Sequence, residues 1–332
     1  MSLPPPFIVT VHNYHPSTTP NNTNTNPVQT YEYIFPSTNP TNPNPPVTPT
    51  PQNALIFIGG LGDGPHTIPY IRQIAKHLSA TASGWTVFEA RLSSVFTGFG
   101  YGSLERDARE LRDLVRYLRR GRGDGQAGFG KVVLMGHSTG CQDCLEYAKG
   151  VVETVGEGER GEVRVDGYIL QGPVSDREAI GMTEDAGEVE SAVLRAVEMV
   201  RGGKGEEVME KGLLPGGWRN NPITAYRWAS LAGVGGDDDY FSSDLSDEKL
   251  AAIWGKLEQP VLIVPSEKDE WVSGEIDVMG QVTKWKGFCK PGIASDLSGL
   301  IPGANHRVDN AEGQEWLSDR VARFLAALEK RE

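Results

Sequence analysis

Cysteine is scarce in this chain, with three residues in 332. So few cysteines, and an odd number of them, do not suggest a disulfide framework. Two of them, Cys141 and Cys144, form a C-x-x-C pair, a spacing that also occurs in redox and zinc sites. Because they fall in a stretch with helical periodicity, we predict two small residues buried on one helix face rather than a redox or zinc pair.

Basic residues are also few relative to acidic ones. Lysine and arginine together number 32 against 44 aspartates and glutamates, which gives a formal net charge of −12 and a pI of about 5.1. Nucleic acids and anionic membranes bind through basic faces, so we expect neither as a main partner. Apolar runs stay below transmembrane length, roughly 18 residues or more. The first residues, 1–6, lack the basic and apolar regions of a signal peptide, so we expect a cytoplasmic protein.

The chain does contain a serine framed by glycines, Gly136-His-Ser-Thr-Gly140, directly after the apolar run 131–135. G-x-S-x-G between a strand and a helix is typical of the nucleophile elbow of α/β-hydrolases. The glycines let the two backbones pass close together and leave the serine hydroxyl exposed. Apolar residues spaced three and four apart predict a helix over 139–152. Ser138 is therefore the candidate nucleophile, and an ordinary glycine-rich strand-to-helix turn is the alternative.

Predicted strands and helices alternate along most of the chain. Apolar runs predict strands at 54–58, 86–92, 131–135, 168–170 and 260–264. Periodic stretches predict helices at 67–79, 103–119, 139–152 and 314–330. This alternation indicates an α/β protein with a mostly parallel sheet and helices on both faces.

We divide the chain into four parts. Residues 1–53 are expected to form an N-terminal strand hairpin with mobile connections, because Asn/Thr/Pro-rich segments bury too little apolar surface to offset ordering entropy. Residues 54–176 and 258–332 are the two parts of the predicted hydrolase core. Between them, 177–257 contains helical pieces and glycine-rich breaks, which indicates a helical cap inserted over the active site.

A serine nucleophile needs a base and an orienting acid, which in α/β-hydrolases follow the serine in the order acid, then histidine. His306 is the one histidine of six that follows Ser138, which makes it the candidate base. Asp269, just past the predicted strand 260–264, is the favoured acid. The rival is Asp176, whose other interpretation is a helix cap or an ion pair with Arg177. Glu267 and Glu270 are weaker substitutes.

The glycine-rich loop Gly59-Gly-Leu-Gly-Asp-Gly64 is the candidate oxyanion hole. We expect one backbone N–H from Leu61, with Gly62 as the alternative, and a second from Thr139, directly after the nucleophile. The loop lacks the lysine and Ser/Thr of a phosphate-binding P-loop. We expect the protein to need no cofactor and no metal ion of its own.

Other sequence patterns are weaker indications of function. Gly123–Gly128 reads G-x-G-x-x-G but follows a predicted helix, whereas a dinucleotide site must follow a strand. Asp237–Asp239 could bind a metal, but no histidine lies nearby, and a solvated loop is the preferred interpretation. Five aromatic residues are candidates for lining a substrate pocket, with core packing as the alternative for each: Phe96, Tyr101, Trp218, Trp228 and Trp271.

Several segments together resemble the fungal esterases that open fusarinine-type ester siderophores, a group of α/β-hydrolases, and their close relatives. The matching strings lie at 59–64, 136–143, 170–178, 266–270 and 298–306. The resemblance covers residues 54–310 and not the N-terminal tract. It implies a serine esterase whose small-molecule substrate is a ferric ester of N-hydroxyornithine units, cleaved in the cytosol to release iron.

Two other functions stay open from the sequence. One is a general carboxylesterase or thioesterase of a small metabolite, which would use the same catalytic residues. The other is a ligand-binding protein on a hydrolase fold without turnover.

Overall fold

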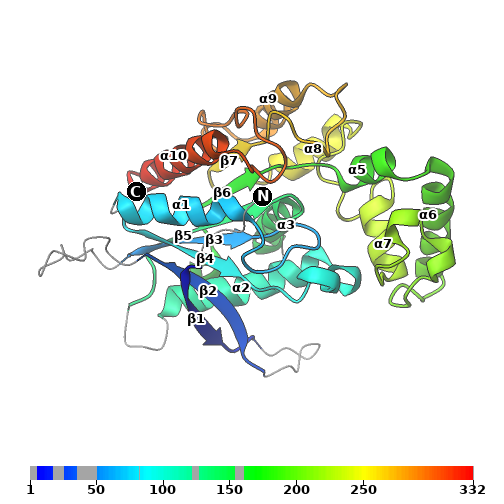
Figure 1. The fold of residues 1–332 in the computed structure, drawn as a ribbon, viewed down its shortest axis with the longest axis horizontal. Coiled ribbons are helices and arrows are strands. Elements are labelled where there is room, and N and C mark those ends of the chain that lie inside the picture. The colour runs from blue at the N-terminus through cyan, green and yellow to red at the C-terminus, as the bar shows by residue number, and fades with distance from the viewer. Residues whose placement is uncertain are drawn as a thin grey trace, which may run out of the picture.

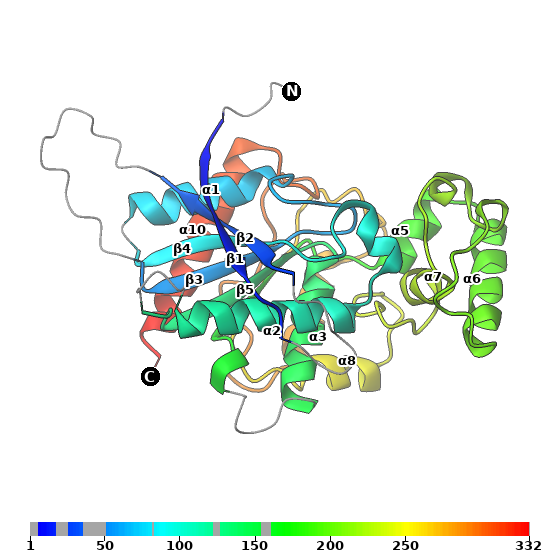
Figure 2. The same ribbon diagram turned by 90° about the horizontal axis from the view of Figure 1, so that it is seen from below.

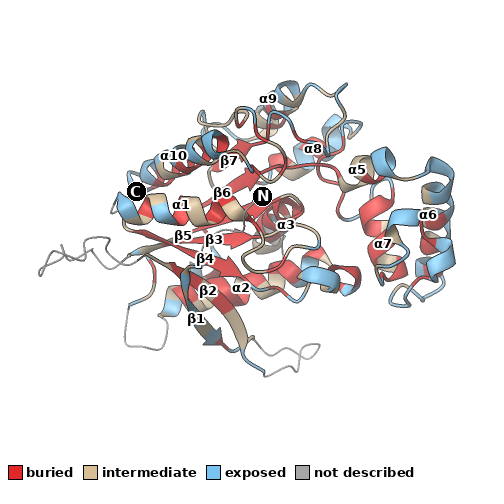
Figure 3. Cartoon of the chain, in the orientation of Figure 1, coloured by how far each residue is buried: buried red, intermediate tan, exposed pale blue. Residues whose placement is uncertain are grey.

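The computed structural model describes residues 6–17, 26–35, 51–81, 83–121, 127–153 and 161–331. Its strands form a seven-stranded sheet in the order β1-β2-β4-β3-β5-β6-β7 (Figure 1). Five strands run parallel: β3 (Asn53–Ile58), β4 (Trp85–Ala90), β5 (Lys131–His137), β6 (Gly167–Gln171) and β7 (Val261–Val264). These strands are apolar runs buried on both faces, as parallel sheets require (Figure 3). The predicted α/β architecture with a mostly parallel sheet is confirmed.

The antiparallel edge comes from the N-terminal hairpin. Strand β1 (Ile8–Tyr14) pairs with β2 (Val28–Ile34), and β2 pairs antiparallel with β4. The Asn/Thr/Pro-rich connections predicted to be mobile fall largely on 18–25 and 36–50, which lie outside the described residues. Most of the G-x-G-x-x-G string at 123–128 also lies outside them.

Two apolar cores lie on opposite faces of the sheet. One face is covered by α1 (Pro69–Ala80) and α10 (Ala311–Glu329), which lie side by side (Figure 1). The other face is covered by α2 (Leu104–Arg120) and α3 (Gly140–Glu153), next to α8 (Asp247–Trp254) and α9 (Val278–Phe288). Cys141 and Cys144 are free thiols buried on α3, which confirms the interpretation of the C-x-x-C pair. Helix α9 was not predicted from the sequence.

A third apolar cluster lies in a separate helical lobe, which projects from one end of the sheet (Figures 1 and 2). The lobe consists of α5 (Asp176–Thr183), α6 (Ala186–Arg201), η2 (Lys211–Leu213), η3 (Gly216–Trp218) and α7 (Ala225–Ala232). Phe99, in η1 (Phe96–Tyr101), joins this cluster from the core. Beyond α7 the chain returns to the central core, where the rings of Trp254 and Trp285 stack at 5.3 Å. The cap boundaries 177 and 257 stay a prediction.

No helix within the described ranges combines the length and apolar character needed to cross a membrane.

Candidate active site

The turn between β5 and α3 holds Ser138 in a strained backbone conformation. Its φ is 54°, in the left-handed region that residues other than glycine rarely adopt. A Cβ on Gly136 would lie 2.1 Å from the carbonyl oxygen of Gly140, so glycine is required where strand and helix cross. The N–H of Ser138 donates to the carbonyl of Gln171 at 3.0 Å, which ties the turn to β6. The serine therefore lies at the tip of a tight strand-to-helix turn.

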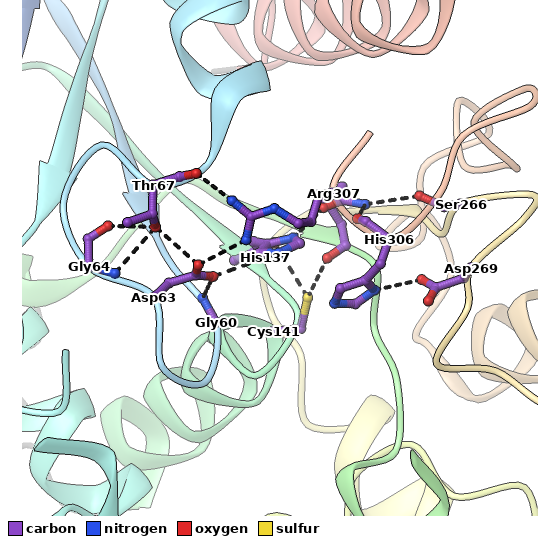
Figure 4. Close-up of polar contacts among 12 residues, drawn as sticks. Gly60, Asp63, Gly64, Thr67, His137, Cys141, Ser266, Asp269, His306 and Arg307 are labelled. Atoms are coloured by element: carbon purple, nitrogen blue, oxygen red, sulfur yellow. Dashed lines mark hydrogen bonds and ion pairs between the residues drawn. The ribbon is translucent and has the colours of Figure 1, made fainter. Parts of the chain in front are cut away.

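His306 and Asp269 lie together beyond the carboxyl end of β7, 37 residues apart in sequence. The Nδ1 of His306 is 2.8 Å from Oδ2 of Asp269, and both side chains are buried (Figure 4). The other carboxylate oxygen of Asp269 accepts the N–H of Trp271 at 3.0 Å, which fixes the carboxylate plane. Because an ionised carboxylate only accepts, the pair places the imidazole proton on Nδ1 and leaves Nε2 able to take a proton.

The two weaker acid candidates contact the histidine loop through its backbone. Glu270 accepts the N–H of His306 at 2.8 Å, and Glu267 accepts the N–H of Gly303 at 2.6 Å. Neither carboxylate is paired with the imidazole. Asp269 therefore contacts the imidazole ring of His306, whereas the two glutamates accept backbone N–H groups of the histidine loop.

The structure does not bring Asp176 to His306. It begins α5, and its Oδ2 accepts from Nε2 of Gln142 at 2.7 Å. Burial, and then the charge of Asp238, raise the pKa of Asp176 well above its ordinary value. This environment favours a neutral carboxyl group, which is the opposite of what an orienting acid needs.

A cavity of about 570 Å³ lies at the carboxyl ends of the parallel strands, between the sheet and the helical lobe. It is lined by Ser138, His306 and Leu61 from the core, by α5 and Trp218 from the lobe, and by Trp271. Trp228 is buried in the core of the lobe, and Phe96 and Tyr101 are exposed outside this cavity. Ligands of open parallel sheets bind at this edge, so the cavity is the candidate substrate site.

The loop 59–64 lies directly against Ser138. A Cβ on Gly60 would lie 2.6 Å from Cβ of Ser138, so only glycine permits this approach. Among the described residues, the N–H groups of Leu61 and Thr139 have no hydrogen-bond acceptor. Leu61 lines the cavity with Ser138, whereas Gly62 does not. Two backbone donors are thus available beside the serine.

A second histidine, His137, lies beside the candidate base. Its ring centroid is 4.8 Å from that of His306, and its Nδ1 is 2.6 Å from Oε1 of Gln171. Burial, and then the neighbouring charge of His306, lower the pKa of His137 from 6.5 to about 3. His137 is therefore neutral at physiological pH and does not compete with His306 as a base. Sequence reasoning missed this contact because one ring ends strand β5 and the other lies in a loop far along the chain.

Sequence reasoning also missed a buried acidic cluster between α2, α3 and the lobe. Asp107 and Asp143 each have one buried carboxylate oxygen without a hydrogen-bond partner in the described chain. Arg227, also buried, forms an ion pair with Asp238 at 2.6 Å. Burial, and then Glu110, raise the pKa of Asp107 from 3.8 to about 7.

The acidic run 237–239 is divided among separate partners. Asp237 accepts from the hydroxyl of Tyr226 at 2.6 Å, Asp238 pairs with Arg227, and Asp239 accepts from the N–H of Gly235 at 3.0 Å. Across the described ranges, no group of three or more His, Cys, Asp or Glu side chains is arranged to hold a metal ion.

The parallel sheet, with its strand–turn–helix at Ser138 and its cavity beyond the strand ends, defines an α/β-hydrolase fold. The solved structure titled "Siderophore hydrolase EstB from Aspergillus fumigatus" matches this chain with a TM-score of 0.70 and 28% identity. The match covers 97% of this chain and 98% of that one.

The chain belongs to the family described as "Protein of unknown function (DUF1749)", whose model matches residues 6–326. "Fusarinine C esterase sidJ" of Aspergillus fumigatus is 32% identical over 325 residues, covering 84% of this chain and 90% of the relative. "Esterase AN6793" of Emericella nidulans is 31% identical over 327 residues, covering 83% and 87%. The resemblance to fusarinine-type siderophore esterases and their relatives is thereby confirmed.

Proposed function

We propose that this protein is a serine esterase that cleaves carboxylic ester bonds of a ferric fusarinine-type siderophore in the cytoplasm. The observation that carries the proposal is the buried His306–Asp269 pair, whose histidine lines the same cavity as Ser138 at its strained turn. The names of two similar proteins, a fusarinine C esterase and a siderophore hydrolase, supply the substrate class.

The proposed reaction begins with proton transfer from Oγ of Ser138 to Nε2 of His306. The serine oxygen attacks the ester carbonyl, and Asp269 stabilises the imidazolium that forms. His306 then gives the proton to the departing alkoxide, which leaves as an alcohol, and an acyl-enzyme remains. Water, deprotonated by His306, cleaves the acyl-enzyme by the same route and regenerates Ser138.

The N–H groups of Leu61 and Thr139 are proposed to stabilise the oxyanion in both steps. Their support is the absence of a competing acceptor among the described residues and the contact of loop 59–64 with Ser138. Donors fixed by the fold need no reorganisation as the charge develops, and one such donor contributes roughly 3–4 kcal/mol to transition-state stabilisation.

The iron travels with the substrate in this proposal. Cleavage of an ester linkage separates hydroxamate units that chelate the metal together, so the linear products hold iron less tightly. The cavity has tryptophan side chains on both the lobe and the core side, which suits a bulky ligand.

The test is mass spectrometry of ferric triacetylfusarinine after incubation with the wild-type protein and with Ser138→Ala. We expect ester-cleaved linear products with the wild type and none with the variant, because no other group supplies the nucleophile. No cleavage by either protein would discard the siderophore substrate and direct the search to smaller esters and thioesters. Equal cleavage by both would refute the role of Ser138.

A further inference from the structure

The side chain of Asp63 connects the candidate oxyanion loop to the candidate histidine loop (Figure 4). Its Oδ2 accepts the N–H of Gly60 at 2.9 Å, and its Oδ1 accepts the hydroxyl of Thr67 at 3.0 Å. Oδ1 also lies 3.2 Å from Nη1 of Arg307, the residue directly after His306. The Asp63 side chain is 12% exposed, so this carboxylate is held mainly by protein donors.

These contacts decide which backbone donors remain for substrate. The N–H of Asp63 donates to the carbonyl of Gly60 at 3.0 Å, while the Asp63 carboxylate takes the N–H of Gly60 in return. This closed turn excludes Gly60 as an oxyanion donor. The N–H of Leu61 is left without an acceptor in the described chain, and the residue faces the cavity.

The same carboxylate brings a negative charge near the place where the oxyanion would form. Oδ2 of Asp63 lies 3.8 Å from Nε2 of His137. That imidazole cannot neutralise the carboxylate, because burial keeps it uncharged. Arg307 is the cation in contact with Asp63, and it is anchored by a second hydrogen bond to the carbonyl of Thr67. An uncompensated carboxylate at this position would oppose the developing oxyanion.

We propose that Asp63 and Arg307 are paired positioning residues of the esterase reaction. Asp63 fixes the conformation of the oxyanion loop by accepting the N–H of Gly60. Arg307 compensates the negative charge of this carboxylate and connects the loop to the histidine segment. The inference rests on the proposed serine-esterase function and adds two residues that line the same cavity as Ser138 and act through the oxyanion loop.

The two roles are separable because asparagine keeps the shape of aspartate without its charge. In Asp63→Asn, the amide oxygen still accepts the N–H of Gly60, but Arg307 loses its carboxylate partner. In Arg307→Met, the loop keeps its hydrogen bond, but the carboxylate charge is uncompensated. The double variant Asp63→Asn/Arg307→Met keeps the loop contact and carries neither charge.

Hydrolysis of p-nitrophenyl acetate measures kcat and KM for each variant. We expect Arg307→Met to lower kcat about tenfold with KM within about threefold, because the effect falls on the transition state. Asp63→Ala removes the acceptor of Gly60 and lowers kcat by about 10- to 100-fold. The double variant should recover kcat to within about threefold of the wild type. If the ion pair only supported the structure, the opposite result would be expected: kcat of the double variant would be no higher than that of Arg307→Met.

The matched control is Arg323→Met, which removes an exposed ion pair with Asp319 on α10 and should leave both constants unchanged. Thermal unfolding identifies any variant that fails to fold. If Asp63→Ala does not fold, the comparison of Arg307→Met with the double variant still tests the charge-compensating role of Arg307. Wild-type kcat in Arg307→Met, or a double variant that is no better, would overturn the charge-compensating role.

Failure of the proposed function is detected separately. A fluorophosphonate probe should label Ser138 of the wild type and should not label Ser138→Ala. An unlabelled wild type contradicts the esterase itself. A labelled and active wild type with unaffected Asp63 and Arg307 variants contradicts only the positioning role.

Discussion

At the scale of single residues, the site combines a strained serine with a histidine held at several points. A left-handed φ at a serine costs on the order of 1–3 kcal/mol and persists only where the surroundings enforce it. Here the enforcing contacts are the Ser138 N–H to Gln171 and the close crossing of Gly136 with Gly140. His306 is fixed through its ring by Asp269 and through its backbone by Glu270.

The assignment of the orienting acid can be tested with one matched pair of variants. Asp269→Asn should lower kcat by roughly 10³- to 10⁴-fold, because an amide that faces Nδ1 through its NH₂ group favours the wrong imidazole tautomer. Asp176→Asn should cost far less, since its carboxyl bonds Gln142 rather than His306. Steady-state hydrolysis of p-nitrophenyl acetate compares the two. A larger loss in Asp176→Asn would reverse the assignment.

At the scale of helices and strands, much of the frame could be predicted from periodicity. The buried strands stand out as short apolar runs, and Ser138 stands out because G-x-S-x-G falls between one of them and a helix. Helix α9 was missed since its apolar face is reduced to a few positions, with Val282 and Trp285 as its buried residues. The contacts of Glu270 with His306 and of Asp63 with Arg307 could not be predicted, because each joins loops whose approach is set by packing.

The acidic cluster between α2, α3 and α7 makes stability depend on pH. The folded-state pKa of Asp107 is about 7, above its ordinary 3.8, so the folded protein binds the proton more tightly than the unfolded chain. The free energy of unfolding should therefore fall as pH rises from about 4 to 7. Asp107→Asn removes this proton uptake, so its free energy of unfolding should fall less over the same interval.

Urea denaturation at several pH values measures this difference. The free energy of unfolding of the variant minus that of the wild type should be larger at pH 8 than at pH 4, by about 1–3 kcal/mol. Glu315→Gln, an exposed position on α10, is the control for the change of one charge. Parallel pH profiles of Asp107→Asn and the wild type would show that Asp107 does not carry the linked proton.

At the scale of the whole molecule, the candidate catalytic residues lie in a cavity whose other side is formed by the separate helical lobe. The core supplies Ser138 and His306 to the cavity, with Asp269 paired to the histidine, while α5 and η3 supply the facing wall. The alternation of strands and helices stops in this part of the sequence, so a helical segment outside the sheet could be predicted. Its orientation could not, because that depends on contacts such as the hydrogen bond from Thr224 to the carbonyl of Gly100.

The two tryptophans of the cavity are unequal as probes of substrate size. Trp218 packs against Phe99 and Trp228, so truncating it would disturb the lobe itself. Trp271 is 40% exposed, and its contact with Asp269 comes from its backbone N–H, which alanine retains.

Trp271→Ala should therefore raise KM for ferric triacetylfusarinine about tenfold, the loss of one aromatic contact of about 1.4 kcal/mol. For p-nitrophenyl acetate, which is too small to reach across the cavity, kcat/KM should stay within about threefold. Equal losses on both substrates would mean that Trp271 supports the catalytic residues, and unchanged kinetics on both would place the bound siderophore away from this wall.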